Sequence, residues 1–132
     1  PLVMEDGRQR RDFVNVRDVV QACRLALEIP GADGYALNIG SGRSYSILEI
    51  AQAMARATGH ESLAPEITHD YRKGDIRNCF ADISLAQSLL GYQPRVSLEA
   101  GLSEFAEWLQ GQTAADCVAR AREELVARGL TI

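Results

Sequence analysis

The chain has 132 residues, which is enough for one domain with a modest hydrophobic core. Hydrophobic residues make up 46% of it, as in ordinary globular proteins, and this excludes a disordered chain. The net charge of −4 argues against a nucleic-acid-binding protein, and no apolar run approaches the roughly 18 residues that a membrane span requires.

The cysteines point to a reducing compartment. Cys23, Cys79 and Cys117 form no CxxC pair, and two of them fall within expected helices, so we expect buried free thiols. The first residues carry no basic region and no long apolar stretch, so the sequence shows no secretory signal. Together these features predict a cytoplasmic protein.

Strand and helix patterns alternate along the chain and predict a mixed α/β (α+β) fold with few short strands and about five helices. Asp6-Gly7, between apolar residues 2–4 and 13–16, predicts a hairpin turn because both residues tolerate positive φ. A helix is expected at residues 17–28. The residues that we expect it to bury are Val19, Val20, Cys23, Leu25 and Leu27.

The middle of the chain carries one strand signal and one capped helix. Residues 35–39 predict a short strand. Ser46 and Glu49 form a capping box, in which each side chain binds the other residue's backbone amide at a helix start. This helix is expected to end at Gly59, with an extended stretch following at residues 66–68.

Three more helices are expected towards the carboxy terminus. A short one begins at Asp82 or Ser84, and a longer one begins at Ser97, because these side chains can accept hydrogen bonds from free amides at a helix start. Thr113 with Asp116 predicts the cap of a last helix.

The expected elements divide into a main unit and a tail. Residues 1–111 form the main unit and residues 112–132 a helical tail, with a joint near Gly111. The few short strands make only a thin sheet. We therefore expect the main unit to expose an apolar surface that another part of a protein would normally cover.

The main chemical signal is a pair of arginine-centred clusters, at residues 7–18 and 71–77. An arginine fork beside a glycine turn is suited to bind a diphosphate through paired hydrogen bonds. Neither cluster contains a catalytic set. His60 and His69 have no nucleophile at a recognisable spacing and no metal set, so both are expected at the surface.

Five short motifs in this order resemble the carboxy-terminal part of NAD-dependent nucleotide-sugar epimerases and dehydratases, the extended short-chain dehydrogenase/reductase family. They are Gln9-Arg10-Arg11-Asp12-Phe13, Leu37-Asn38-Ile39-Gly40-Ser41-Gly42, Arg72-Lys73-Gly74-Asp75, Ala81-Asp82 and Leu90-Gly91-Tyr92-x-Pro94. The resemblance covers residues 2–109. It implies the carboxy-terminal portion of that fold without most of the Rossmann domain, which would cover the apolar face and hold NAD.

The resemblance also assigns roles to single residues. Arg11 and Arg72 are expected on the diphosphate of a nucleotide-diphosphate sugar, and Asp75 near the ribose hydroxyls. Asn38 follows the expected strand, and it either lies near the diphosphate or fixes the local backbone. Lys73 adds positive charge without an assigned contact.

From the residues alone, more ordinary interpretations stay open. Arg11 can be a surface arginine paired with Asp12 or Asp18, and residues 72–75 a solvated charged turn. Asp12 and Asp18 are expected to be structural, and Arg8 and Arg10 solvated. The glycines of Gly40-Ser41-Gly42 lack the GxGxxG spacing, so this segment is expected to be a plain loop.

Redox chemistry in the resembled enzymes requires a glycine-rich dinucleotide loop and a Tyr-x-x-x-Lys pair, and the sequence contains neither. We therefore expect a substrate-binding region that binds no NAD and cannot perform the redox step by itself. The alternative is a stand-alone, non-catalytic binding or interaction module derived from that fold. The nucleotide base, the sugar, and the choice among epimerase, dehydratase, decarboxylase and reductase stay open.

Overall fold

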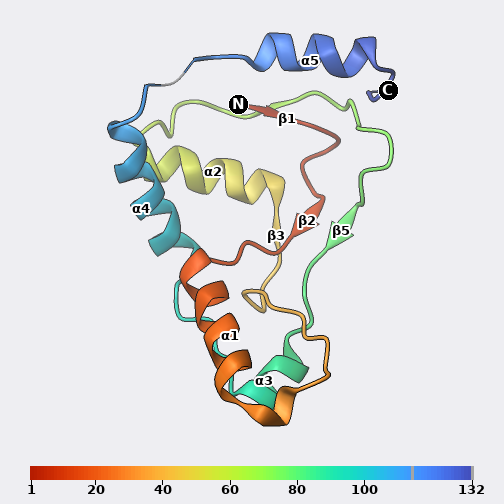
Figure 1. Ribbon diagram of the computed structural model, residues 1–132. Coiled ribbons are helices and arrows are strands. Elements are labelled where there is room, and N and C mark those ends of the chain that lie inside the picture. Colours follow the sequence, from red (N-terminus) through yellow and green to blue (C-terminus); the bar gives the residue numbers. More distant parts are fainter. Residues whose placement is uncertain (114, 132) are drawn as a thin grey trace.

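The computed structural model of the chain describes residues 1–113 and 115–131. Within these residues it contains five α-helices and five two-residue strands, which confirms the expected mixed α/β fold with few strands (Figure 1). The helices are α1 (Val16–Glu28), α2 (Ile47–Ala57), α3 (Ser84–Leu90), α4 (Leu98–Gln110) and α5 (Val118–Ala127), with a short 3-10 helix at Pro30–Ala32. None of the helices in the described part of the chain has the length and apolar character of a membrane span.

The strands form two small sheets. They are β1 (Leu2–Val3), β2 (Arg10–Arg11), β3 (Tyr45–Ser46), β4 (Glu66–Ile67) and β5 (Asn78–Cys79). β1 pairs in parallel with β4, whereas β2 lies between β3, to which it is antiparallel, and β5, to which it is parallel. The extended stretch expected near residue 66 is therefore confirmed, as β4.

The hairpin expected around Asp6-Gly7 is wrong. A turn does form, because the Gly7 amide donates to the Met4 carbonyl at 3.3 Å, but β1 and β2 lie in different sheets. The backbone before the turn pairs with β4, and the Gly7 carbonyl accepts from the Leu48 amide at 2.9 Å. The local signal identified the turn correctly, and distant segments supplied the strand partners.

Side-chain caps set the starts of α2 and α4. Ser46 and Glu49 form the expected capping box, with the Ser46 amide donating to Glu49 Oε2 at 2.6 Å and the Glu49 amide to Ser46 Oγ at 3.1 Å. Ser97 caps α4 as expected. The expectation that Thr113 caps the last helix is wrong, because α5 begins five residues further on, where Asp116 Oδ1 accepts from the Val118 amide.

The strand expected at residues 35–39 is also wrong. These residues follow an irregular path and belong to neither of the two sheets in the described part of the chain. Their apolar pattern fits a strand, but no described strand pairs with them. Conversely, β5 was missed, because Asn78–Cys79 carries no strand pattern and pairs only through its position beside β2.

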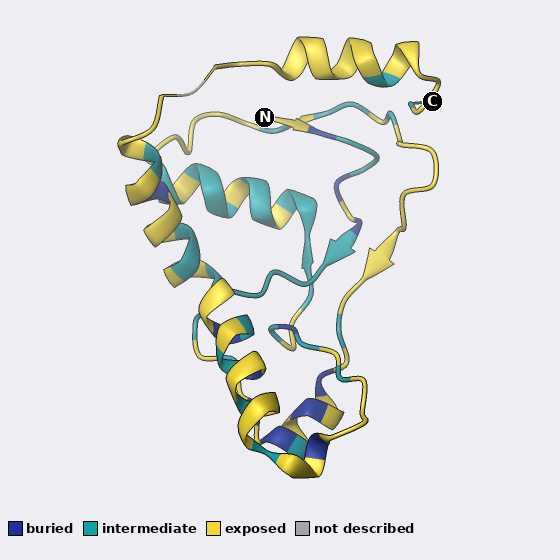
Figure 2. Ribbon diagram, in the orientation of Figure 1, coloured by how far each residue is buried: buried dark blue, intermediate teal, exposed yellow. Residues whose placement is uncertain are grey.

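The core is small and lies at the narrow end of the molecule, where α1, the 3-10 helix and α3 meet (Figure 2). Its buried members are Ala22, Ala32, Ile83, Ala86, Leu90 and Tyr92. Tyr92 is fully buried, and its hydroxyl donates to the Gly40 carbonyl at 2.9 Å. Burial, followed by the charges of Asp18 and Asp12, raises the pKa of Tyr92, so the hydroxyl stays protonated and can donate.

Several burial expectations are wrong because α1 packs through the face that carries Asp18 and Ala22. Val20 and Leu27 are instead 62% and 90% exposed. All three cysteines are exposed, so the expected buried thiols are absent from the described residues. The hydrophobic residues of α1 mark a helix correctly, but only some of them face the core.

Large apolar side chains are exposed on several elements. On α4, Phe105 and Trp108 stack with their ring centroids 5.6 Å apart and are 44% and 57% exposed. Val16 on α1 and Phe80 after β5 are also exposed. Exposed apolar side chains on several elements of one small chain are typical of a surface that meets another protein unit.

We expect Tyr92→Phe to destabilise the chain by about 1–2 kcal/mol, because the Gly40 carbonyl loses its buried donor. Urea unfolding followed by circular dichroism measures this change. Tyr35→Phe is the control, since Tyr35 is 61% exposed and its unfolding free energy should not change. Equal unfolding midpoints for Tyr92→Phe and the original chain would contradict the structural role of this hydroxyl.

Candidate functional site

The two arginine clusters meet at Asp75. Parallel pairing of β2 with β5 brings Arg11 beside the loop that precedes β5. Arg11 Nη2 lies 2.9 Å from Asp75 Oδ1, and Arg72 Nη2 lies 2.9 Å from Asp75 Oδ2. One carboxylate thus bridges two guanidinium groups from distant parts of the sequence.

The Arg11 guanidinium donates four hydrogen bonds, and three of them connect β2 to the loop. Besides Asp75, its guanidinium donates to the carbonyls of Arg10 at 2.9 Å, Arg77 at 3.1 Å and Ile76. These bonds use the four Nη hydrogens of the guanidinium. The expected alternative, a pair with Asp12 or Asp18, does not form, since Arg11 pairs with Asp75.

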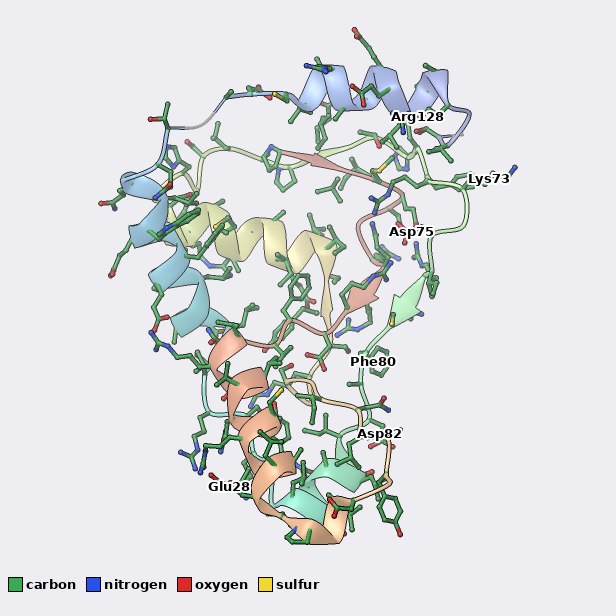
Figure 3. The ribbon with its side chains drawn as sticks, in the orientation of Figure 1. Glu28, Lys73, Asp75, Phe80, Asp82 and Arg128 are labelled. Atoms are coloured by element: carbon green, nitrogen blue, oxygen red, sulfur yellow. The ribbon has the colours of Figure 1, made fainter. Side chains whose placement is uncertain are left out.

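Arg72 is far more accessible than Arg11. Its side chain is 55% exposed, compared with 24% for Arg11. Among the hydrogen bonds within the described residues, its guanidinium donates only to Asp75. Lys73 next to it extends away from the ribbon into solvent (Figure 3). Arg72 is therefore the arginine of this pair with donors still available to an anion.

Asp75 is ionised in this arrangement. Partial burial opposes its charge, but the hydrogen bond and charge of Arg72, the Ile76 amide and the charge of Arg11 together lower its pKa below the usual value. The carboxylate is therefore available as an acceptor over the whole neutral range.

A second ion cluster supports the same loop. Arg77 Nη1 lies 2.6 Å from Glu5 Oε2, and its Nη2 lies 2.7 Å from Asp6 Oδ2. The hydrogen bonds with Asp6 and Glu5 raise the pKa of Arg77, and the bond with Arg77 lowers the pKa of Asp6. Sequence analysis assigned no contact to Arg77. The sequence did contain a signal for this cluster, namely the acidic pair Glu5-Asp6 and the basic segment at residues 72–77.

These side chains surround an open hollow of about 420 Å³ on the surface of the molecule. Its lining residues are Glu5, Asp6, His69, Tyr71, Arg72, Asp75 and Arg77. The hollow offers guanidinium donors beside carboxylate acceptors. Such a lining can bind a ligand that combines an anionic group with hydroxyl groups.

Asn38 is not part of this cluster. It is exposed, and within the described residues it makes no hydrogen bond or salt bridge to Arg11, Arg72 or Asp75. Its assignment to the site stays a prediction from the resemblance.

Asp12 and Asp18 are structural, as expected. Asp12 Oδ1 accepts from the Ser41 amide at 2.8 Å, which orders the glycine loop. Asp18 is 2% exposed, and it accepts from the amides of Arg95 and Val96 at 2.9 and 3.1 Å rather than capping its own helix. Both carboxylates thus tie distant loops to the core.

Two other expectations about polar residues can be compared with the structure. The expectation of a solvated Arg10 is wrong, because its Nε donates to Ser44 Oγ at 2.9 Å and the residue is half-buried. No group of three or more His, Cys, Asp or Glu residues in the described ranges could hold a metal ion.

Comparison with known proteins shows the family. The family described as GDP-mannose 4,6 dehydratase matches residues 1–105. The chain is 35% identical over 105 residues to dTDP-L-rhamnose 4-epimerase of Burkholderia thailandensis, covering 80% of this chain and 28% of that protein. It is 36% identical over 108 residues to UDP-glucose 4-epimerase of Bacillus subtilis, covering 79% of this chain and 31% of that protein.

Solved structures of epimerases also resemble this chain. UDP-glucose 4-epimerase of Thermotoga maritima, crystallised with UDP-glucose, superposes with a TM-score of 0.75 at 36% identity, covering 83% of this chain and 34% of that one. UDP-glucuronic acid 4-epimerase of Bacillus cereus, in complex with UDP-glucuronic acid and NAD, gives a TM-score of 0.74 at 32% identity, with the same coverage of 83% and 34%.

The fold is that of the carboxy-terminal part of an extended short-chain dehydrogenase/reductase. The chain belongs to the NAD-dependent nucleotide-sugar epimerase and dehydratase family. It spans about a third of the length of the relatives that it matches.

The pKa of Asp75 leads to a prediction about pH. Because its folded pKa lies below the ordinary value of 3.8, the unfolded chain binds more protons in this range, and stability falls as pH drops through the folded pKa. Asp75→Asn should therefore be less stable than the original chain at about pH 7, and the difference should shrink towards about pH 3.

Urea unfolding at several pH values measures this difference. Asp33→Asn is the matched control, since Asp33 is exposed and makes no salt bridge within the described residues. A stability difference between Asp75→Asn and the original chain that does not vary with pH would show that the charge of Asp75 is not what stabilises the loop.

Proposed function

We propose that this chain supplies the nucleotide-diphosphate-sugar-binding part of an epimerase or dehydratase. The observation that carries the proposal is the convergence of Arg11 and Arg72 on Asp75 beside an open hollow. The family membership supports it, and a relative of similar structure was crystallised with UDP-glucose.

In this proposal Arg72 makes the main contact with the diphosphate. Its exposed guanidinium can give two parallel hydrogen bonds to phosphate oxygens, a geometry that an arginine fork matches well. Asp75, held ionised, accepts from the two vicinal hydroxyls of the ribose.

Arg11 has a double role in the proposal. Its three bonds to the loop orient Asp75, and its positive charge lies close enough to add to the attraction of an anion. A direct bond from Arg11 Nη to phosphate requires that one of these carbonyl or carboxylate partners be exchanged for the ligand. Asn38 remains a candidate for a contact near the diphosphate.

The redox step belongs to residues outside this sequence. A Tyr-x-x-x-Lys pair and a glycine-rich dinucleotide loop are required for it, and the sequence contains neither. We propose that a Rossmann domain supplies both, holds NAD and covers exposed apolar side chains such as Phe105 and Trp108. NAD is present together with UDP-glucuronic acid in the Bacillus cereus relative.

We expect this chain to bind UDP with a dissociation constant between about 1 μM and 1 mM, and Arg72→Ala to weaken it about tenfold or more, because a charge-assisted hydrogen bond is lost. Calorimetric titration with UDP, dTDP and GDP measures this affinity, and added salt should weaken it. Arg24→Ala is the control, because among the described residues Arg24 pairs only with Glu28 on α1.

Arg72 is a cleaner test than Arg11, since Arg11→Ala also removes three bonds that hold the loop. Binding of UDP with equal affinity by Arg72→Ala and the original chain would rule out the proposed site. Absence of binding to all three nucleotides would remove the proposal for the isolated chain and favour the non-catalytic module.

We further expect no binding of NAD by this chain, because the residues that would hold it lie in the proposed Rossmann domain. Titration of the chain with NAD, under the conditions that detect UDP, tests this. Saturable binding of NAD would contradict the proposed division of roles.

A further inference from the structure

The tail of the chain lies beyond the family match, which ends at residue 105. Its helix α5 runs across the wide end of the molecule, above β1, and the chain then turns back towards the loop that precedes β5 (Figure 1). Because the family pattern does not include the tail, family membership assigns no role to it.

Apolar side chains of the tail and of the main unit line the space between them. A hollow of about 200 Å³ lies between Leu2 and Met4 on one side and Val118, Ala121 and Leu125 on the other. Leu125 is the one residue of α5 that is not exposed. Leu125 therefore lines the apolar hollow between α5 and the main unit, and the rest of the helix is exposed.

The polar part of the contact is directed at residues 70–73. Arg122 Nη2 lies 2.8 Å from Asp70 Oδ2. The Lys73 amide donates to the Leu130 carbonyl at 2.8 Å, and Arg72 forms an antiparallel β-bridge with Thr131. The tail thus binds both ends of the short segment that carries Arg72.

The opposite side of this segment is bound to the main unit. The Glu5 amide donates to the Asp70 carbonyl at 2.8 Å, and Arg72 itself pairs with Asp75. Residues 70–73 therefore lie between the turn after β1 and the tail. Without the tail, they would keep contacts on one side only.

We propose that residues 118–131 form a strap that fixes the conformation of residues 70–73 and so positions the Arg72 side chain. Its effect on the loop is independent of the ligand, whereas its consequence for nucleotide binding rests on the proposed function. Within the described residues, the strap is held by one ion pair and a short backbone pairing, with Leu125 at the apolar hollow. It can therefore detach without unfolding the core, which lies at the other end of the molecule (Figure 2).

This arrangement couples the strap to the site. If a docked strap favours the binding-competent position of Arg72, bound ligand must favour the docked strap by the same factor.

The test uses two variants of the strap and a matched control for each. Leu125→Asp places a charge in the apolar hollow between α5 and the main unit, and Arg122→Ala removes the ion pair with Asp70. Leu27→Asp and Arg120→Ala are the controls, since Leu27 is 90% exposed on α1 and the Arg120 side chain, which pairs with Glu124 on the same helix, is 80% exposed.

Hydrogen exchange at the Lys73 amide, followed by NMR, reports the strap directly, because this amide donates to Leu130. We expect exchange about threefold to tenfold faster in Leu125→Asp, and a smaller increase in Arg122→Ala, with both controls unchanged. Exchange equal to that of the original chain in both strap variants would overturn the inference, whether or not the chain binds UDP.

Titration with UDP then separates the inference from the proposed function. Weaker UDP binding in the strap variants, with UDP slowing Lys73 exchange in the original chain, supports both. Unaltered UDP affinity despite faster exchange would overturn the positioning of Arg72. Faster exchange in a chain that binds no UDP would remove the proposed function and leave the strap as a device that orders the loop.

Discussion

The site depends on one carboxylate placed between two arginines. The guanidinium groups of Arg11 and Arg72 both lie next to Asp75 and would repel each other without it. The ionised carboxylate of Asp75 compensates both charges. This compensation matters because each strand of the sheet has only two residues, so β2 and β5 contribute few backbone hydrogen bonds of their own. The side-chain bonds of Arg11 to the loop carbonyls extend that short pairing.

The same principle recurs throughout the fold. Much of the chain consists of loops, and polar side chains bind the backbone of those loops. Asp18 binds the amides of Arg95 and Val96, and the buried hydroxyl of Tyr92 binds the Gly40 carbonyl. Such bonds persist because a buried polar group without a partner costs free energy. A chain with little sheet and a small core can in this way hold its loops in place.

The family relationship gives these features a common context. The chain matches about a third of the length of its relatives, one of which was crystallised with both UDP-glucuronic acid and NAD. The exposed aromatic pair of α4 and the accessible Arg72 both lie outside the small core, which is formed around α1, the 3-10 helix and α3. The exposed aromatic pair suits a part that packs against a neighbouring domain.

Local chemistry in the sequence was sufficient to locate the starts of α2 and α4. The capping box of Ser46 and Glu49 and the Ser97 cap involve neighbours within one turn, so their positions follow from sequence spacing. The resemblance, and not spacing, pointed to Arg11, Arg72 and Asp75, and their mutual contact became visible only in the folded chain. The hairpin, the strand at residues 35–39 and the buried cysteines were wrong because strand partners and core contacts come from segments far away in the sequence. For the same reason, the acidic pair Glu5-Asp6 was visible in the sequence, but only the fold shows that Arg77 binds it and that the tail reaches Lys73.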